Sequence, residues 1–366
     1  MPTKLPPVPL VRAVQTAIHA VHLLKRAITP GPLILADLAF SAYMLSNAIL
    51  VFTRLGVADV LESGPRAVDD IARAVEANPA VLKRLLRALA RLGVIDEGAP
   101  GVYALNNVSK LLVSTPGSMH SLLSVVSQPW HMAMWSHLYD VVKTGRPAHE
   151  IVLGKPLFDH FAEDSEANKL FNQSMVDYTS QMAVALTAAV DFGHARKVVD
   201  IGGGYGHALA IVLKAYPHLR GAVAELASVV PGATAFLAEA GVGDRAEAVS
   251  ADFFEHVPGG GDVYLLMNVL HDWGDANAER ILRACRAAMP ESAQLYIVDM
   301  LVPEDRSPHE SVLFDLEMLI LFHEGRERTR TELERLLTSA GFSLSNVIRT
   351  ALPFSVIEVR PIPGAR

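Results

Sequence analysis

Cysteine is almost absent from this chain, since Cys285 is the only one among 366 residues. A single cysteine excludes an intramolecular disulfide and any cysteine-based metal cluster, and it favours a reducing compartment. Charged residues are sparse at 19%, while hydrophobic residues make up 51%. With enough length for two domains of ordinary size, the chain is not a disordered, collagenous or disulfide-stapled protein.

A surplus of basic charge is lacking as well. Lys and Arg number 32 against 39 Asp and Glu, which gives a formal net charge of −7. Phosphate binding needs a basic surface, so we expect no nucleic-acid partner. The longest apolar run, residues 38–53, is interrupted by Ser and Asn and is shorter than the roughly 20 residues of a membrane span. No signal peptide is evident, so we expect a cytoplasmic protein with no membrane partner.

The first 62 residues predict two kinds of helix. Residues 1–30 repeat apolar residues at spacings of three and four, which predicts an amphipathic helix with a mildly basic face formed by Lys4, Arg12, Lys25 and Arg26. Residues 32–62 are apolar on nearly every side, so a helix here must be buried on every side. A small N-terminal domain has too little cover for it. We therefore expect a homodimer that forms through the N-terminal domain.

Residues 68–112 read as two short helices followed by a hairpin, the outline of a winged helix. Asn78 and Pro79 open the second helix, and Gly93 marks its end. DNA binding is the usual role of such a module, and a winged-helix DNA-binding regulator stays open as an alternative. Residues 31–110, however, hold equal numbers of basic and acidic residues. This balance favours a structural or dimerising role.

The middle of the chain, residues 113–185, is helical and rich in Trp, Phe and Met. Such side chains form either core or the wall of an apolar pocket for an aromatic ligand. From about Phe192 to Asp299, strand-like runs alternate with helix-like stretches. That alternation predicts a mostly parallel, Rossmann-like α/β sheet covered on both faces.

The most informative local pattern is a strand that breaks into a glycine-rich turn at Gly202 and Gly204 and then opens a helix. Such a turn lets a ligand approach the backbone and offers it free N–H donors. The third glycine of a dinucleotide fingerprint is replaced by His207, and the spacing resembles S-adenosylmethionine (SAM) sites instead. Glu225 ends the next strand, 23 residues after Gly202, where its carboxylate can accept hydrogen bonds from a ribose.

The strand after that one leads into a further pair of candidate ligand contacts. Asp252 is placed to accept from an adenine amino group, and Phe253 is placed to cover the ring.

Together these motifs make the chain similar to SAM-dependent O-methyltransferases of the plant caffeate type and of bacterial natural-product pathways. The resemblance spans nearly the whole chain and includes the motifs at residues 224–226, 252–254, 269–273, 281–286, 315–318 and 326–329. It implies a helical dimerisation and substrate-lid domain over 1–185 and a SAM-binding methyltransferase domain over 186–366. It also implies that the product S-adenosylhomocysteine forms. No metal-ligand spacing of His, Asp and Glu recurs in the sequence, so we expect no metal.

The resemblance assigns roles to individual residues. His271 falls at the general base, Asp299 and Glu327 at its flanking carboxylates, and Met267 at a further cofactor contact. Neutral imidazole can take a proton from a phenol during attack on the methyl group. Candidates for the wall of a pocket for a small aromatic, hydroxylated substrate are Trp130, Met175, Asn268, Met318 and Phe322.

One further alternative stays open, a SAM-binding relative that has lost methyl transfer and performs hydroxylation or cyclisation. The acceptor atom also stays open, because nitrogen or carbon could replace oxygen.

Overall fold

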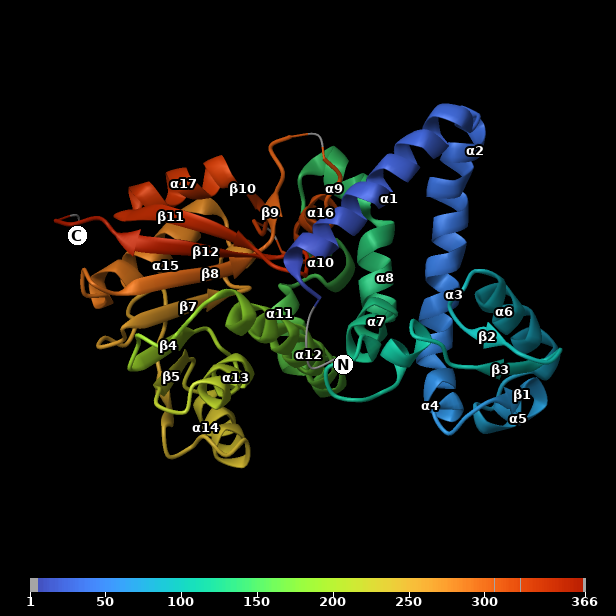
Figure 1. Ribbon diagram of the computed structural model, residues 1–366, viewed down its shortest axis with the longest axis horizontal. Coiled ribbons are helices and arrows are strands. Elements are labelled where there is room, and N and C mark those ends of the chain that lie inside the picture. Colours follow the sequence, from blue (N-terminus) through green and yellow to red (C-terminus); the bar gives the residue numbers. More distant parts are fainter. Residues whose placement is uncertain (1–5, 306, 323, 365–366) are drawn as a thin grey trace. The chain divides into compact units, whose positions relative to one another are not determined.

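The computed structural model describes residues 6–305, 307–322 and 324–364, apart from the side chains of Arg12, Gln15, His19, His22 and Arg26 (Figure 1). The chain forms two compact units. The first comprises Arg12–Ser136 and Phe158–Tyr178, and the second comprises His137–Leu157 and residues 179–364 together with residues 6–11. Helix α12 (Ser165–Ala189) contributes to both units, and a domain boundary at 185/186 stays a prediction.

The first unit is mainly helical. Its helices are α1 (Val8–Ile28), α2 (Gly31–Ala36), the π-helical turn η1 (Asp37–Ser41), α3 (Ala42–Arg54), α4 (Val57–Leu61), α5 (Val68–Ala74), α6 (Pro79–Arg91), the 3-10 turn η2 (Ser109–Leu112), α7 (His120–Val126), α8 (Pro129–Ser136) and α11 (Leu157–Glu163). Its three short strands, β1 (Arg66–Ala67), β2 (Asp96–Glu97) and β3 (Val102–Ala104), form a sheet in the order β1-β3-β2.

Helices α5 and α6 and this small sheet confirm the winged-helix outline. The Asn78 side chain accepts from the Val81 N–H over 3.1 Å and so caps α6. Gly93, with φ of 77°, follows the end of the helix. Buried residues from α3 to η2, including Phe52, Leu86 and other side chains with almost no exposure, form a core for this module by themselves.

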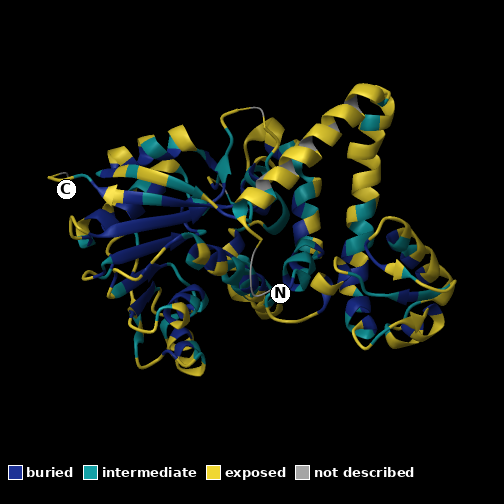
Figure 2. Cartoon of the chain, viewed as in Figure 1, coloured by how far each residue is buried: buried dark blue, intermediate teal, exposed yellow. Residues whose placement is uncertain are grey.

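The helices before this module expose much of their apolar surface, which is yellow in Figure 2. Leu35, Leu38, Phe40 and Tyr43 are each at least 60% exposed. The segment Gly31–Arg54 is a continuous helix of 24 residues, longer than the apolar run seen in the sequence, because η1 continues it without a break. By length and composition alone it could cross a membrane, a test that protein-covered helices also pass.

The predicted basic face of α1 is only partly described. Lys25 forms an ion pair with Asp37 at 2.8 Å. Lys4 and the side chains of Arg12 and Arg26 lie outside the described residues. Apolar residues on this helix, such as Val14 and Val21, are at least half exposed.

The second unit is an α/β domain. Its strands are β4 (Lys197–Ile201), β5 (Arg220–Glu225), β6 (Ala246–Ser250), β7 (Val263–Met267), β8 (Gln294–Asp299), β9 (Leu301–Val302), β10 (Arg328–Thr329), β11 (Phe342–Arg349) and β12 (Ser355–Pro361). Its helices are α9 (Leu138–Thr144), α10 (Ala148–Leu153), α13 (His207–Ala215), α14 (Val230–Glu239), the 3-10 turn η3 (Leu270–Asp272), α15 (Asp275–Ala288), α16 (Ser311–Leu321) and α17 (Arg330–Ser339).

Seven of these strands form one sheet in the order β11-β12-β8-β7-β4-β5-β6. The pairs from β8 to β6 are parallel, and β12 pairs antiparallel with both β8 and β11. The central strands are buried on both faces, as Figure 2 shows in dark blue. The predicted mostly parallel Rossmann-like domain is therefore confirmed.

The strand order places the ends of β4 and β7 side by side. The chain runs from β4 outward to β5 and β6, then returns to the other side of β4 as β7. Such a reversal opens a crevice at the carboxyl ends of the two central strands, where ligands of open α/β sheets bind. The glycine-rich turn leaves β4 and the His271 segment leaves β7, so the fold brings these two predicted motifs to one edge.

Candidate active site

The glycine-rich turn after β4 depends on backbone angles that favour glycine. Gly202, Gly204 and Gly206 have φ of 67°, 57° and 88°. A Cβ at Gly204 would meet no atom within 4 Å, so the space over the turn is open there. A Cβ at Gly206 would instead lie 2.9 Å from Val223 and 3.0 Å from Leu237, because α13 starts close to the sheet and α14. The turn thus presents its backbone to a ligand at Gly204.

The acidic and aromatic residues predicted for cofactor binding border this turn. The Glu225 carboxylate accepts from the Gly204 N–H over 3.1 Å and from the Leu226 N–H over 2.8 Å. A Cβ at Gly202 would lie 3.4 Å from the Phe253 ring, so that ring covers the turn. The structure therefore brings Glu225 and Phe253 to the glycine turn.

Asp252 stands beside Phe253 in the loop after β6. Its side chain accepts from the Phe254 N–H over 2.9 Å, and the residue is exposed. This bond orients the loop and leaves the second carboxylate oxygen for another partner.

A buried carboxyl group lies beneath the turn. Asp200 in β4 is 1% exposed, and its Oδ2 atom has no hydrogen-bond partner among the described residues. Burial and the nearby Glu225 carboxylate raise the pKa of Asp200 to about 7. The site therefore combines a buried acceptor without a partner, an open glycine turn and the acidic Glu225. This combination suits a ligand that carries donor groups and positive charge. These acceptor groups fit SAM, whose amino acid portion and ribose carry donor groups.

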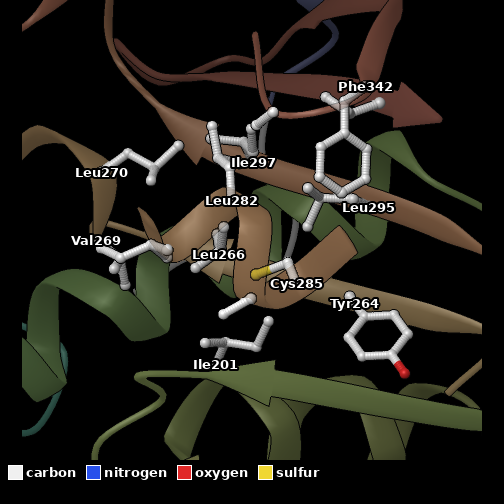
Figure 3. Packing of buried hydrophobic residues seen from close by; sticks show 14 of the residues in the cluster. Ile201, Tyr264, Leu266, Val269, Leu270, Leu282, Cys285, Leu295, Ile297 and Phe342 are labelled. Carbon is white, nitrogen blue, oxygen red and sulfur yellow. The ribbon is translucent and has the colours of Figure 1, made fainter. Parts of the chain in front are cut away.

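Hydrophobic packing fixes the segment that follows β7. Val269 and Leu270 are 5% and 0% exposed and belong to the main core of the second unit, together with Leu266 and Leu282 (Figure 3). His271 comes directly after them in η3 and is held at the edge of this core, with a side chain that is 13% exposed. Core packing therefore sets the direction of the loop that carries the predicted base.

Carboxylates surround the His271 ring. Its Nδ1–H donates to Glu327 Oε1 over 2.9 Å, and its Nε2 lies 3.5 Å from Asp272 Oδ1. Since a carboxylate only accepts, the Glu327 bond keeps the proton on Nδ1 and leaves Nε2 as the basic nitrogen of the neutral ring. The negative charge of Asp299 also favours the protonated form of the ring.

These charges change the acidity of the whole group. Burial lowers the pKa of His271, but Asp272, Glu327 and Asp299 outweigh burial and raise it to about 10. Burial, with repulsion from neighbouring carboxylates, raises the pKa of Asp299 to about 7 and that of Asp272 to about 6. The arrangement is one imidazole held among three carboxyl groups, and it stabilises an imidazolium strongly.

Two short strands bring the flanking carboxylates together. Asp299 ends β8, which pairs with β7, and β10 pairs with β9 just beyond Asp299. Glu327 precedes β10, and its N–H donates to Asp315 Oδ1 over 2.9 Å. Asp299 Oδ1 and Glu327 Oε2 are both buried without a hydrogen-bond partner among the described residues. The site thus keeps two unused acceptor atoms next to the histidine.

The remaining predicted cofactor and substrate contacts of the second unit lie on β7, just after it, and on α16. Met267 ends β7, and Asn268 follows it with φ of 54° and an N–H that donates to Val298 over 3.1 Å. Met318 is buried in α16, and Phe322 lies against Gly325. Asn268 and Phe322 therefore stand beside the His271 segment.

Trp130 and Met175 lie in the first unit. Trp130 on α8 packs edge-on against His131, His160 and Phe161, with ring centroids 5.6 to 5.9 Å apart. Met175 lies on α12 and is half-buried. Their contribution to a substrate pocket stays a prediction.

Comparison with known proteins places this site in a family. A model described as an O-methyltransferase domain matches residues 135–343, and one described as an O-methyltransferase dimerisation domain matches residues 37–115. The phenazine O-methyltransferase PhzM of Lysobacter antibioticus is 38% identical over 322 residues, which cover 88% of this chain and 94% of the relative. The chain belongs to the O-methyltransferase family. It is a SAM-dependent methyltransferase of the bacterial natural-product type.

Further comparisons show that the relatives of this methyltransferase differ in the atom that they methylate. The 8-amino-8-demethylriboflavin N,N-dimethyltransferase of Streptomyces davaonensis is 35% identical over 316 residues, 85% of this chain and 90% of the relative. The solved structure of CalO1, a methyltransferase in calicheamicin biosynthesis in its SAH-bound form, has a TM-score of 0.80 and 32% identity. It covers 90% of this methyltransferase and 98% of that chain. Both oxygen and nitrogen acceptors thus occur among the relatives of the methyltransferase.

Three residues near the methyltransferase site lie in the motifs at 269–273, 315–318 and 326–329 but were given no role in the sequence analysis. Asp272 lies by His271 Nε2, Asp315 holds the backbone of Glu327, and Arg328 contacts the loop around His271. Asp272 could have been suspected because it is adjacent to His271. The resemblance includes Asp315 and Arg328 in its motifs, but the sequence does not show what they contact, since their contacts join distant segments. Among the described residues, no group of three or more His, Cys, Asp or Glu side chains is arranged to hold a metal ion.

Proposed function

We propose that this enzyme transfers a methyl group from SAM to a phenolic hydroxyl of a small aromatic natural product, with His271 as the general base. Glu225, Asp252, Phe253, Met267 and the glycine turn would hold SAM. Bound SAM supplies an electrophilic methyl group on a sulfonium leaving group. The chain must therefore orient an acceptor and remove its proton.

The observation that carries the proposal is the position of His271 among three carboxyl groups. Its Nε2 is the basic nitrogen of the neutral ring, because Nδ1–H is engaged with Glu327 at 2.9 Å. Carboxylates raise the pKa of this ring to about 10, close to the pKa of a phenol, also about 10. The raised pKa makes the neutral ring a stronger base toward a phenol, and because the ring is protonated below its own pKa, we expect transfer to be fastest at alkaline pH.

The same argument favours oxygen over nitrogen as the acceptor. A neutral amine attacks through its lone pair before it loses a proton, so it gains little from a base of raised pKa. A phenol is a weak nucleophile until its proton leaves, so it gains directly from such a base. Asp299 and Glu327 would stabilise the imidazolium that forms.

Apolar side chains would hold the ring of the substrate. Met318 and Phe322, with Asn268 as a polar contact, are proposed for the second unit, and Trp130 and Met175 for the first. Aromatic and thioether side chains adapt to flat ligands.

We also propose a cytoplasmic homodimer. The family match over residues 37–115 is to a dimerisation domain, and it includes the exposed apolar side chains of η1 and α3. A partner subunit would cover these side chains, so a membrane is not needed to explain their exposure.

The decisive experiment is incubation of the purified enzyme with methyl-labelled SAM and a panel of phenazines, phenolic polyketides, flavonoids and catechols, followed by mass spectrometry. We expect one labelled methyl group on a hydroxyl. His271→Ala should bind SAM normally and lose about 10² to 10⁴ in turnover. The exposed His194 offers a matched control, and His194→Ala should keep full activity.

The outcomes separate the rival functions. A labelled nitrogen would move the enzyme to the N-methyltransferases of the family. A product that gains oxygen or a ring without a methyl group would favour the relatives that hydroxylate or cyclise. Full turnover by His271→Ala would remove the base from the mechanism.

A further inference from the structure

A buried arginine spans the loop that carries His271. The Arg328 side chain is 4% exposed, and its Nη1 donates to the Leu270 carbonyl over 2.8 Å. Its Nη2 donates to the Trp273 carbonyl over 2.7 Å, and both Nε and Nη2 donate to Asp275 Oδ1 at 3.0 and 2.9 Å. The two carbonyls lie immediately before His271 and two residues after it. One guanidinium thus fixes both ends of the turn.

The residues before Arg328 fit against the same turn. The Arg326 N–H donates to the His271 carbonyl over 2.8 Å. A Cβ at Gly325 would lie 3.1 Å from that carbonyl oxygen, and a Cβ at Gly274 would lie 2.5 Å from the Glu324 carboxylate. Residues 324–328 are therefore in close contact with residues 270–275, through the backbone at Gly325 and Arg326 and through side chains at Glu324 and Arg328. Little space is left for the turn to move while this contact holds.

We propose that Arg328 is a positioning residue for methyl transfer, which holds the turn so that His271 Nε2 stays directed at the acceptor hydroxyl. Arg328 does not touch the reacting atoms. It acts through the Leu270 and Trp273 carbonyls, while the neighbouring Glu327 orients the ring itself. The inference rests on the proposed role of His271 as the base.

The geometry requires arginine. Its planar guanidinium offers five N–H donors in a rigid fork, and here it serves two carbonyls and one carboxylate at once. Lysine keeps the positive charge but has one compact ammonium group on a flexible stem. Replacement by lysine therefore keeps the charge near the site and removes the fixed spacing between Leu270 and Trp273.

The test compares Arg328→Lys with Arg330→Lys. Arg330 lies two residues away on α17, is 55% exposed and pairs with Glu334 at 2.8 Å. A base displaced by about 1 Å can cost on the order of 10²-fold in rate. We expect Arg328→Lys to lower kcat by about 10- to 100-fold, with SAM affinity and KM nearly unchanged. Arg330→Lys should match the wild type.

A merely structural role would give another pattern. It would lower Tm and the amount of folded enzyme, and active-site titration with SAM would then account for the lost rate. The proposal requires that the loss persist per SAM-binding site. A kcat within twofold of the wild type for Arg328→Lys would overturn it.

Combination with His271→Ala shows whether the two residues act together. If Arg328 acts through His271, Arg328→Lys should have no further effect on the residual rate of His271→Ala. An equal additional loss in that background would overturn the inference and leave the base assignment intact. Full activity of His271→Ala would instead refute the base and, with it, the inference.

A second variant covers the case in which Arg328→Lys does not fold. Asp275 is 64% exposed, so Asp275→Asn should fold while weakening the anchor of the guanidinium. We expect a smaller fall of kcat in the same direction with KM unchanged, and an unchanged kcat would count against the proposal.

Discussion

Glu327 offers the most direct way to measure the electrostatics of this site. Its side chain is 1% exposed, and its only hydrogen bond to the base is the 2.9 Å contact with His271 Nδ1. Glu327→Gln keeps the size of the side chain and an amide oxygen that can still accept from Nδ1–H. The substitution removes one negative charge from the surroundings of the imidazolium.

The size of the effect follows from the contact. A hydrogen bond to a charged group contributes about 1.5 to 3 kcal/mol, and one pKa unit corresponds to about 1.4 kcal/mol. Loss of the Glu327 charge should therefore lower the pKa of His271 by about 1 to 2 units from its value near 10. The pKa should fall because the lost carboxylate favours the protonated ring. It should stay above its ordinary value because Asp272 and Asp299 still raise it.

The pKa of His271 can be measured directly in the wild type and in Glu327→Gln by long-range proton–nitrogen NMR of histidine-labelled enzyme between pH 5 and 11. His271→Ala identifies the signal, and no substrate is needed. The reasoning is refuted if His271 in the wild-type enzyme titrates at or below 6.5, or if Glu327→Gln leaves its midpoint unchanged.

The kinetics should follow the same shift. Only the neutral ring accepts a proton, so kcat/KM should rise with pH as His271 deprotonates. In Glu327→Gln this rise should move to lower pH by the same 1 to 2 units, and the plateau should be lower because the base is weaker. A rise that persists unchanged in His271→Ala would belong to ionisation of the substrate.

Three further predictions concern the rest of the chain. Asp200 has a raised pKa in the folded state, so its stabilising proton is lost as pH rises through about 7; Asp200→Asn should therefore increase the free energy of unfolding more at pH 8 than at pH 5, by up to about 3 kcal/mol, and an equal increase at both pH values would contradict this. In urea unfolding, Gly206→Ala should lower the free energy of unfolding by about 1 to 3 kcal/mol more than Gly241→Ala does. Both glycines have positive φ, but only a Cβ at Gly206 would meet packed side chains. Equal losses would exclude the steric cause. Phe40→Asp should yield monomers in light scattering while Tyr139→Asp, which is outside the matched dimerisation region and equally exposed, should not, and a dimeric Phe40→Asp enzyme would place the interface elsewhere.

Local patterns were enough to predict several elements of this protein. Asn78 and Pro79 start a helix and Gly93 ends it because capping and backbone angles depend on adjacent residues. The strand and glycine turn at Gly202 were predicted for the same reason, since the left-handed φ values there suit only a few residue types.

Contacts between distant segments could not be predicted in this way. The sequence placed His271 and Glu327 in one site through resemblance to a family, because 56 residues separate them and no periodicity joins them. The contact of Arg328 with the Leu270 and Trp273 carbonyls had no signal at all, since backbone carbonyls carry no sequence identity.

Apolar composition determined by itself that a helix over residues 32–62 needs cover, because water disfavours so much exposed hydrocarbon. It also determined the two kinds of unit, since helical and strand periodicities are local properties. Only the tertiary structure decided the acidity of the base. Burial and three carboxyl groups from separate strands and loops together set the pKa of His271, and electrostatic interaction depends on distances through space that the order of residues does not contain.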